Sequence, residues 1–170
     1  RLGACQYKCL DPHRDDTHSA TPPYECLRIL ISICFTEDFE EEKLEPDIIA
    51  VLDVKRAHFH SKARRDDLYV ELCEEDAEPG MCALLLKSMY GTQDASACFY
   101  DFYSDVFINK CNLRRGKGCP CLFFHEVKKV RAYTHGDEFV LVGKRKESVE
   151  VAAEIGKWME VKVKVILGFD

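Results

Sequence analysis

Apolar residues recur at two different spacings along this chain, and these spacings predict both helices and strands. Apolar positions at every third or fourth residue predict three helices, which begin at Thr21-Pro22-Pro23, at Asp94 and near Glu147. Short apolar or alternating runs predict strands at residues 47–55, 67–72, 81–87, 121–125, 132–143 and 161–167. The strand at 132–143 is interrupted by a polar step, so we expect a hairpin there. The mixture predicts an α+β protein.

Each predicted helix has one apolar stripe that we expect to face the core. Thr21 can cap the first helix, and proline suits its first turn because no N–H is needed there. The three stripes are Leu27, Leu30, Ile31 and Cys34, then Phe99, Phe102, Tyr103 and Val106, then Val151, Ala152, Ile155 and Met159. We interpret the aromatic stripe as core packing, and a base-stacking surface is the alternative.

Acidic residues stand at two positions where a divalent metal could bind. Gly136-Asp137-Glu138 forms the tip of the predicted hairpin, and Asp53 stands near the end of the apolar strand at residues 47–55. Mg²⁺ takes a few carboxylate oxygens together with substrate phosphates. Asp53 would complete such a site if its strand lies next to the hairpin.

Four stretches resemble motifs of copia-type (Ty1/copia) retrotransposon reverse transcriptases, in the family's order. Asp53-Val54-Lys55-Arg56-Ala57-His58 resembles motif A, and His135-Gly136-Asp137-Glu138 resembles motif C. Between them, Ser88-Met89-Tyr90-Gly91-Thr92-Gln93-Asp94-Ala95 is similar to the family pattern S-L-Y-G-x-x-Q-A. Thr21-Pro22-Pro23-Tyr24-Glu25 looks like the segment ahead of the first palm strand, and Leu167-Gly168 resembles motif D.

The resemblance implies a particular fold. We expect a reverse-transcriptase-like palm, in which an antiparallel βαββαβ sheet carries helices on one face. Residues 1–46 would be a fingers-like N-terminal segment with one helix. Residues 47–170 would be the palm, with a fingers insertion at about residues 60–90, and the family's thumb would lie outside the chain. This sheet would bring Asp53 beside Asp137.

The resemblance also implies a reaction, which is nucleotidyl transfer by an RNA-directed DNA polymerase of a retrotransposon Pol polyprotein. Asp53 and Asp137 would bind two Mg²⁺ or Mn²⁺ ions, and Glu138 stands where the family has a second catalytic aspartate. The nucleotide-binding residues would be Val54 and Lys55, through their backbone N–H groups, with His58 and Gln93. An RNA template, a DNA primer and a deoxynucleotide would be its partners.

Three departures from the family pattern fall on this site and leave other functions open. Glu138 replaces an aspartate, His58 replaces an aromatic residue, and Gln93 stands one place early. We expect the fragment to be inactive alone. The second hypothesis is a catalytically dead structural or interaction subunit derived from a reverse transcriptase. The third is an unrelated RNA-recognition module, but its strands would need exposed aromatic residues, which these strands mostly lack.

Composition modifies this interpretation. The 170 residues carry 24 basic and 30 acidic side chains, a net charge of −6, whereas proteins that bind nucleic acid usually present a basic surface.

Of the ten cysteines, Cys119 and Cys121 could join His125 in a zinc site, but no fourth ligand is evident. We therefore expect reduced thiols in an intracellular, reducing compartment such as cytoplasm or nucleus.

The chain shows no membrane-targeting segment. No apolar run approaches the ~18 residues of a transmembrane helix, and no signal-peptide pattern follows Arg1. Because the first residue is not Met, we expect an internal piece of a polyprotein.

Overall fold

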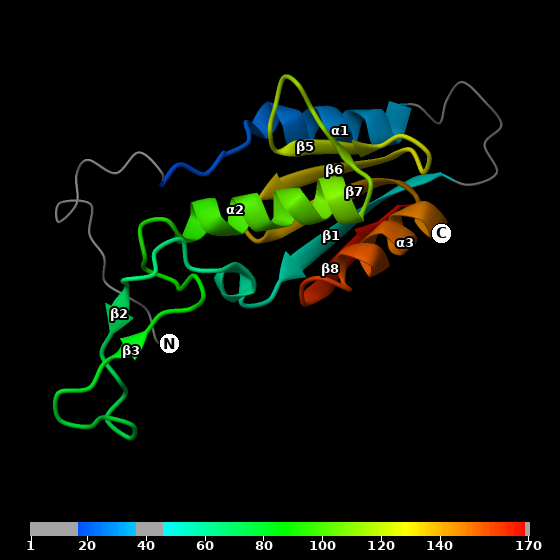
Figure 1. Cartoon of the computed structure of the whole chain (residues 1–170). Helices are drawn as coiled ribbons and strands as arrows, with labels where there is room; N and C mark the ends of the chain where they lie inside the picture. Colours follow the sequence, from blue (N-terminus) through cyan, green and yellow to red (C-terminus); the bar gives the residue numbers. More distant parts are fainter. Residues whose placement is uncertain (1–16, 37–45, 169–170) are drawn as a thin grey trace. The chain divides into compact units, whose positions relative to one another are not determined.

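A computed structural model describes residues 17–36 and 46–168 (Figure 1). These divide into two compact units, which we treat separately. The larger unit contains residues 20–36, 46–55 and 103–168, and the smaller contains residues 17–19 and 56–102. Most of the predicted fingers-like segment, residues 1–16 and 37–45, lies outside the described residues.

The larger unit is built on an antiparallel sheet with the strand order β4-β5-β6-β7-β1-β8. Its strands are β1 (Asp47–Val54), β4 (Arg114–Arg115), β5 (Leu122–His125), β6 (Val130–His135), β7 (Glu138–Lys144) and β8 (Val161–Leu167). The α+β class and the antiparallel sheet are therefore confirmed. The small strand β4 was not predicted.

Helices connect the strands in the order that the apolar pattern predicts. These are α1 (Tyr24–Thr36), α2 (Ala95–Asp105), its π-helical continuation η4 (Val106–Lys110) and α3 (Arg145–Ile155). Read along the chain, β1, α2, β6, β7, α3 and β8 follow a β-α-β-β-α-β order. The order puts β1 in the middle, with β7 on one side and β8 on the other. It also places the end of β1 beside the turn between β6 and β7.

Helices cover both faces of this sheet: α1 packs on one face, and η4 and α3 lie together on the other. Leu30 and Cys34 of α1 pack on Tyr133, Val140 and Val142. Alternate residues of β7 point the other way, and there Phe139 meets Phe107 of η4. Strands buried on both faces read as continuous apolar runs, and β7 has one. The helix α1 therefore belongs to the same unit as the sheet, whereas the predicted boundary at residue 46 separates them.

An aromatic cluster fills the core between η4 and the sheet. The Phe107 ring lies 5.1 Å from the rings of both Phe123 and Phe139, and 5.7 Å from that of Tyr103. The Tyr103 hydroxyl lies 3.1 Å from Thr134 Oγ1, so its polar end is also satisfied. Of the predicted aromatic stripe, Tyr103 and Val106 are buried in this core, Phe99 is buried in the smaller unit, and Phe102 is half-buried.

Several element boundaries and facing residues differ from the predictions. The helix α3 ends at Ile155 and not near Met159, although Met159 is buried in the following turn. Ile31 is exposed, so the buried stripe of α1 is narrower than expected. The strand β8 is mostly exposed because it lies at the end of the sheet's strand order. In the part of the chain that the structure describes, no helix is long and apolar enough to cross a membrane.

The smaller unit contains short elements only. A 3₁₀ turn η3 (Ala57–His60) precedes β2 (Tyr69–Val70), which pairs with β3 (Ala83–Leu84). The predicted strands 67–72 and 81–87 are therefore present as a hairpin but are much shorter. Two strands with mostly exposed side chains have little apolar surface to bury, which limits their length.

We predict that Phe107→Ala lowers the free energy of unfolding by about 3–5 kcal/mol, since it empties the centre of the aromatic cluster. Urea denaturation followed by circular dichroism would measure this. Ile108→Ala on the same turn is the matched control, because Ile108 is exposed. Equal effects of the two substitutions would contradict a core centred on Phe107.

Candidate functional site

The end of β1 and the tip of the β6–β7 hairpin form the candidate site. Asp53 on β1 stands directly opposite Glu138 on β7. One residue further, the Val54 N–H donates a hydrogen bond to the Asp137 carbonyl oxygen at 2.9 Å. Acidic residues far apart in the sequence are thus brought together on neighbouring strands, as the sequence led us to expect.

The turn that presents Asp137 depends on Gly136. A two-residue hairpin loop requires a positive φ at its first position when it has type II′ geometry, and Gly136 has φ +61°. Most other residues would be strained there. Asp137 follows at the tip with an exposed side chain, whereas its backbone carbonyl is held by Val54. Glu138 is the first residue of β7.

A lysine joins the acidic residues on the two strands. Lys164 Nζ lies 2.9 Å from Asp53 Oδ1 and 2.7 Å from Glu138 Oε1. These hydrogen bonds, the one to Glu138 first, raise the pKa of Lys164 above that of a free lysine, so its ammonium keeps its charge at neutral pH. All three side chains are partly exposed, and we expect the contact to weaken with salt.

A β-bulge in β8 accounts for the position of Lys164. Val51 pairs with Val165 while Leu52 pairs with Val163, which leaves Lys164 as the extra residue. A bulge re-aims the side chains of its strand. Lys164 therefore reaches past Asp53 on the adjacent strand and contacts Glu138 on the strand beyond it.

The side chains that converge differ from those predicted to bind metal. We assigned metal binding to Asp53 and Asp137, and the structure joins Asp53 and Glu138 through an ammonium group. Carboxylate oxygens are the ligands that Mg²⁺ prefers, so the donors fit this metal in chemistry. Among the described residues, however, no three His, Cys, Asp or Glu side chains converge as a metal-binding group. A divalent ion would have to displace Lys164.

The expected nucleotide-binding residues have other contacts in this structure. The N–H groups of Val54 and Lys55 donate to the Asp137 and Glu160 carbonyl oxygens, both at 2.9 Å, so neither is left for a phosphate oxygen. The Lys55 ammonium also lies 2.7 Å from the Glu160 carboxylate. The nucleotide-binding role of Val54 and Lys55 stays a prediction, and a triphosphate would have to replace these hydrogen bonds.

His58 and Gln93 belong to the smaller unit. The His58 ring packs edge-on against Tyr90, with ring centroids 4.3 Å apart, and lies 6.2 Å from the ring of Phe99. Gln93 is half-buried in the turn before α2. The sequence indicated a nucleotide-binding role for both residues, and that role stays a prediction.

The cysteines considered for zinc form part of the core. Cys119 and Cys121 are buried, and Cys121 Sγ donates to the Ala20 carbonyl oxygen at 3.3 Å. Burial, followed by the neighbouring Cys119, raises the pKa of Cys121 to about 11. The thiol therefore stays protonated at neutral pH, whereas a zinc ligand is a thiolate. His125 instead accepts a hydrogen bond at Nδ1 from the Lys128 N–H.

No family model, curated protein or solved structure matches this chain. The site is therefore interpreted from its own residues and from the resemblance of its motifs. Lys164 is the residue that sequence reasoning missed. The sequence feature that could have indicated it is the alternation Val161-Lys162-Val163-Lys164, in a strand that the βαββαβ order places beside β1.

We predict that Lys164→Gln makes the chain bind Mn²⁺ about tenfold more tightly, because a positive charge leaves the two carboxylates. Isothermal titration calorimetry at low salt would measure the affinity. Lys162→Gln is the matched control: Lys162 stands opposite Asp53 in register but makes no ion pair among the described residues. A gain of the same size in both variants would show that Lys164 has no special position.

Proposed function

We propose that this chain is the palm region, with part of the fingers, of an RNA-directed DNA polymerase from a copia-type retrotransposon Pol polyprotein. One observation carries the proposal: at the end of the central strand β1, Asp53 stands opposite Glu138, and the following residue, Val54, is hydrogen-bonded to Asp137. These are the acids that the motif resemblance assigns to catalysis. The strand order that brings them together is also the order that the resemblance implies.

In this proposal, Asp53 and Asp137 would hold two Mg²⁺ or Mn²⁺ ions, and Glu138 would assist. Two such ions activate the primer 3′-hydroxyl and stabilise the leaving pyrophosphate when they are bound. The chain's own contribution is to position the carboxylates. The exposed tip keeps Asp137 accessible, and Gly136 determines the direction in which the tip leaves β6. Glu138 has one methylene more than aspartate, and a displacement of about 1 Å can cost about a hundredfold in rate.

A second candidate function has support from the ion pairs. Lys164 occupies Asp53 and Glu138, and the N–H groups of Val54 and Lys55 are bonded to the protein's own carbonyl groups. Each of these contacts stabilises the end of β1. Each also occupies a group that a metal ion or a nucleotide would otherwise bind. They favour a structural or interaction subunit that is derived from a reverse transcriptase and has lost catalysis.

Primer extension on an RNA template separates the two functions. With Mn²⁺ present and a thumb domain fused to the chain, we expect the wild type to add deoxynucleotides slowly, and Asp137→Asn to abolish the addition because a metal ligand is lost. Lys164→Gln should increase the rate, since it frees two carboxylates. Gel analysis of a labelled primer would measure all three.

The controls address folding and thumb function. Circular dichroism should show that Asp137→Asn folds as the wild type does, since this side chain makes no ion pair among the described residues. The chain without a thumb domain is assayed in parallel, and we expect it to be inactive. If neither the wild type nor Lys164→Gln adds a nucleotide in the fused form, the second candidate function replaces the first.

A further inference from the structure

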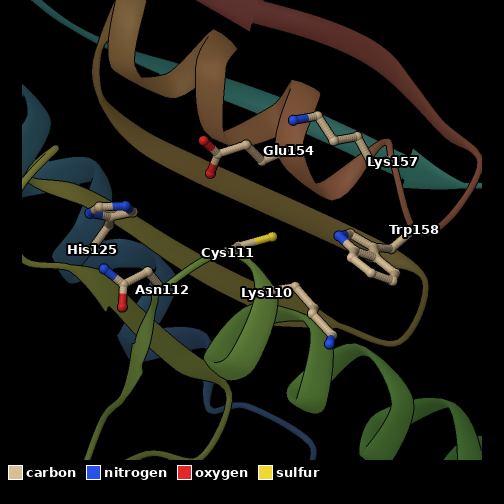
Figure 2. A pocket seen from close by; sticks show the side chains of 7 residues that line it. All are labelled: Lys110, Cys111, Asn112, His125, Glu154, Lys157 and Trp158. Carbon is tan, nitrogen blue, oxygen red and sulfur yellow. The ribbon is translucent and has the colours of Figure 1, made fainter.

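A polar pocket lies in the larger unit, on the face of the sheet that η4 and α3 cover. It has a volume of about 420 Å³, which is within the range of small-ligand sites. Its lining residues are Lys110, Cys111, Asn112, His125, Glu154, Lys157 and Trp158. Figure 2 shows His125 and Asn112 on one side of the pocket and Trp158 on the other, with Cys111 between them. None of the residues assigned to the polymerase site takes part.

Two backbone irregularities form one wall of this pocket. The π-helical turn η4 ends where the Cys111 N–H donates to the Val106 carbonyl oxygen at 2.9 Å. The next residue, Asn112, has φ +56°, which a side-chain-bearing residue seldom adopts. Single π-helical turns are rare and occur frequently at functional sites. In this chain the π-helical turn and the left-handed Asn112 together direct three consecutive residues, 110–112, toward the pocket.

The pocket is rich in hydrogen-bond donors. Side-chain N–H groups come from five of the seven lining residues, namely Lys110, Asn112, His125, Lys157 and Trp158. His125 is buried, and its Nδ1 accepts the Lys128 N–H at 3.2 Å. In the neutral ring the proton is then on Nε2, which makes this nitrogen a donor as well.

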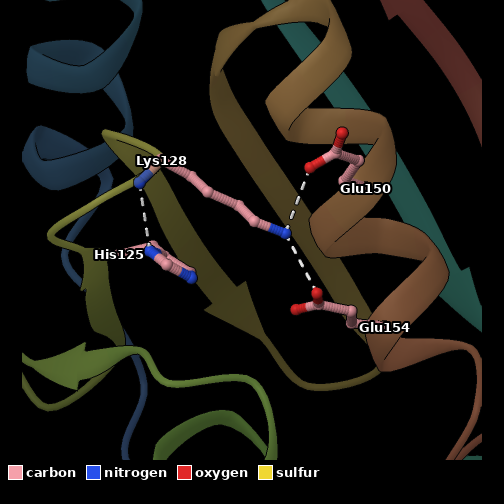
Figure 3. Close-up of polar contacts among 4 residues, drawn as sticks. All are labelled: His125, Lys128, Glu150 and Glu154. Carbon is pink, nitrogen blue, oxygen red and sulfur yellow. Dashed lines mark hydrogen bonds and ion pairs between the residues drawn. The ribbon is translucent and has the colours of Figure 1, made fainter.

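The carboxylate of the pocket, Glu154, shares its ion-pair partner Lys128 with Glu150. Lys128 Nζ lies 3.0 Å from Glu154 and 3.3 Å from Glu150, as Figure 3 shows. These contacts, the one to Glu154 first, raise the pKa of Lys128, so it stays charged. Lys110 and Lys157 have no carboxylate partner among the described residues, and Lys110 Nζ lies 5.1 Å from the centre of the Trp158 ring. Lys110, Lys157 and Lys128 against Glu154 and Glu150 leave a net charge of +1 around the pocket.

The thiol in the pocket wall does not provide a nucleophile. Burial, followed by Glu154, raises the pKa of Cys111 to about 11. A protonated thiol is a poor nucleophile and a poor metal ligand. We therefore assign no role to this thiol, and binding in the pocket depends on the N–H donors of its lining.

We propose that this pocket binds the phosphate monoester group of a small metabolite or nucleotide. A phosphate monoester carries nearly two negative charges at neutral pH and offers only acceptor oxygens. Two lysines and the N–H groups of Asn112, His125 and Trp158 match that charge and that acceptor pattern. The volume also leaves room for the organic part of the molecule beside Trp158.

The chain's only tryptophan provides a direct measurement, since Trp158 lines the pocket. The full chain is titrated with glycerol phosphate, which does not absorb where tryptophan does, while Trp158 emission is recorded. Inorganic phosphate and glycerol are titrated in parallel, and adenosine monophosphate against adenosine is tested by calorimetry. We expect saturable binding of both monoesters, tighter than that of inorganic phosphate, and none of glycerol or adenosine.

Substitutions test whether the change in Trp158 emission comes from binding in this pocket. Lys157→Gln and Lys110→Gln should each weaken binding of glycerol phosphate about tenfold, because each removes one charge-assisted hydrogen bond. Lys146→Gln removes the same charge from an exposed position on α3 outside the pocket and should leave the affinity unchanged.

Three results would overturn the proposal. The first is that no monoester binds, and the second is that all three lysine variants weaken binding equally, which indicates a general charge effect. The third is that a DNA oligonucleotide without terminal phosphates binds in place of the monoesters, which would assign the pocket to a nucleic-acid backbone. Failure of primer extension has no bearing on these results, because the two sites share no residue.

Discussion

The pairing of β1 with two antiparallel neighbours is the constraint on which the rest of this structure depends. Its backbone is bonded to β7 on one side and to β8 on the other, so a buried strand has no unsatisfied edge. The register with β7 sets Asp53 against Glu138, and the register with β8 brings Lys164 to both. A shift of one residue would turn every side chain to the opposite face. The candidate site is thus a consequence of strand pairing.

The same pairing explains why the negative charges of the candidate site are partly neutralised by another residue of the protein. Two carboxylates on adjacent strands repel each other unless a positive charge lies near them. In a polymerase that charge would come from divalent ions, whereas here an ammonium group from the third strand provides it. A chain with a net charge of −6 gains from such internal neutralisation. In this structure the cation between Asp53 and Glu138 is the ammonium group of Lys164.

Local patterns predicted the elements well because each depends on neighbouring residues. The stripe of α1, the continuous apolar run of β7 and the glycine turn at 136 are readable from short windows of sequence. The meeting of Asp53 with the hairpin tip was predictable once the strand order was inferred. The contact of Lys164 with these acids was not predictable, because it depends on a bulge, and a bulge arises from a mismatch between two paired strands. The pocket was missed as well, because it combines a π-helical turn, a left-handed Asn112 and residues of β5 and α3.

The position of β8 at the end of the sheet also affects how the protein behaves in concentrated solution. An edge strand exposes hydrogen-bonding groups to which a strand of another molecule can add, and β8 carries exposed apolar side chains such as Val163 and Leu167. Lys162, Lys164 and the bulge at Lys164 oppose such an addition, because a charged, bent edge is a poor template. The residue that neutralises the candidate site therefore also protects the chain from aggregation through its sheet.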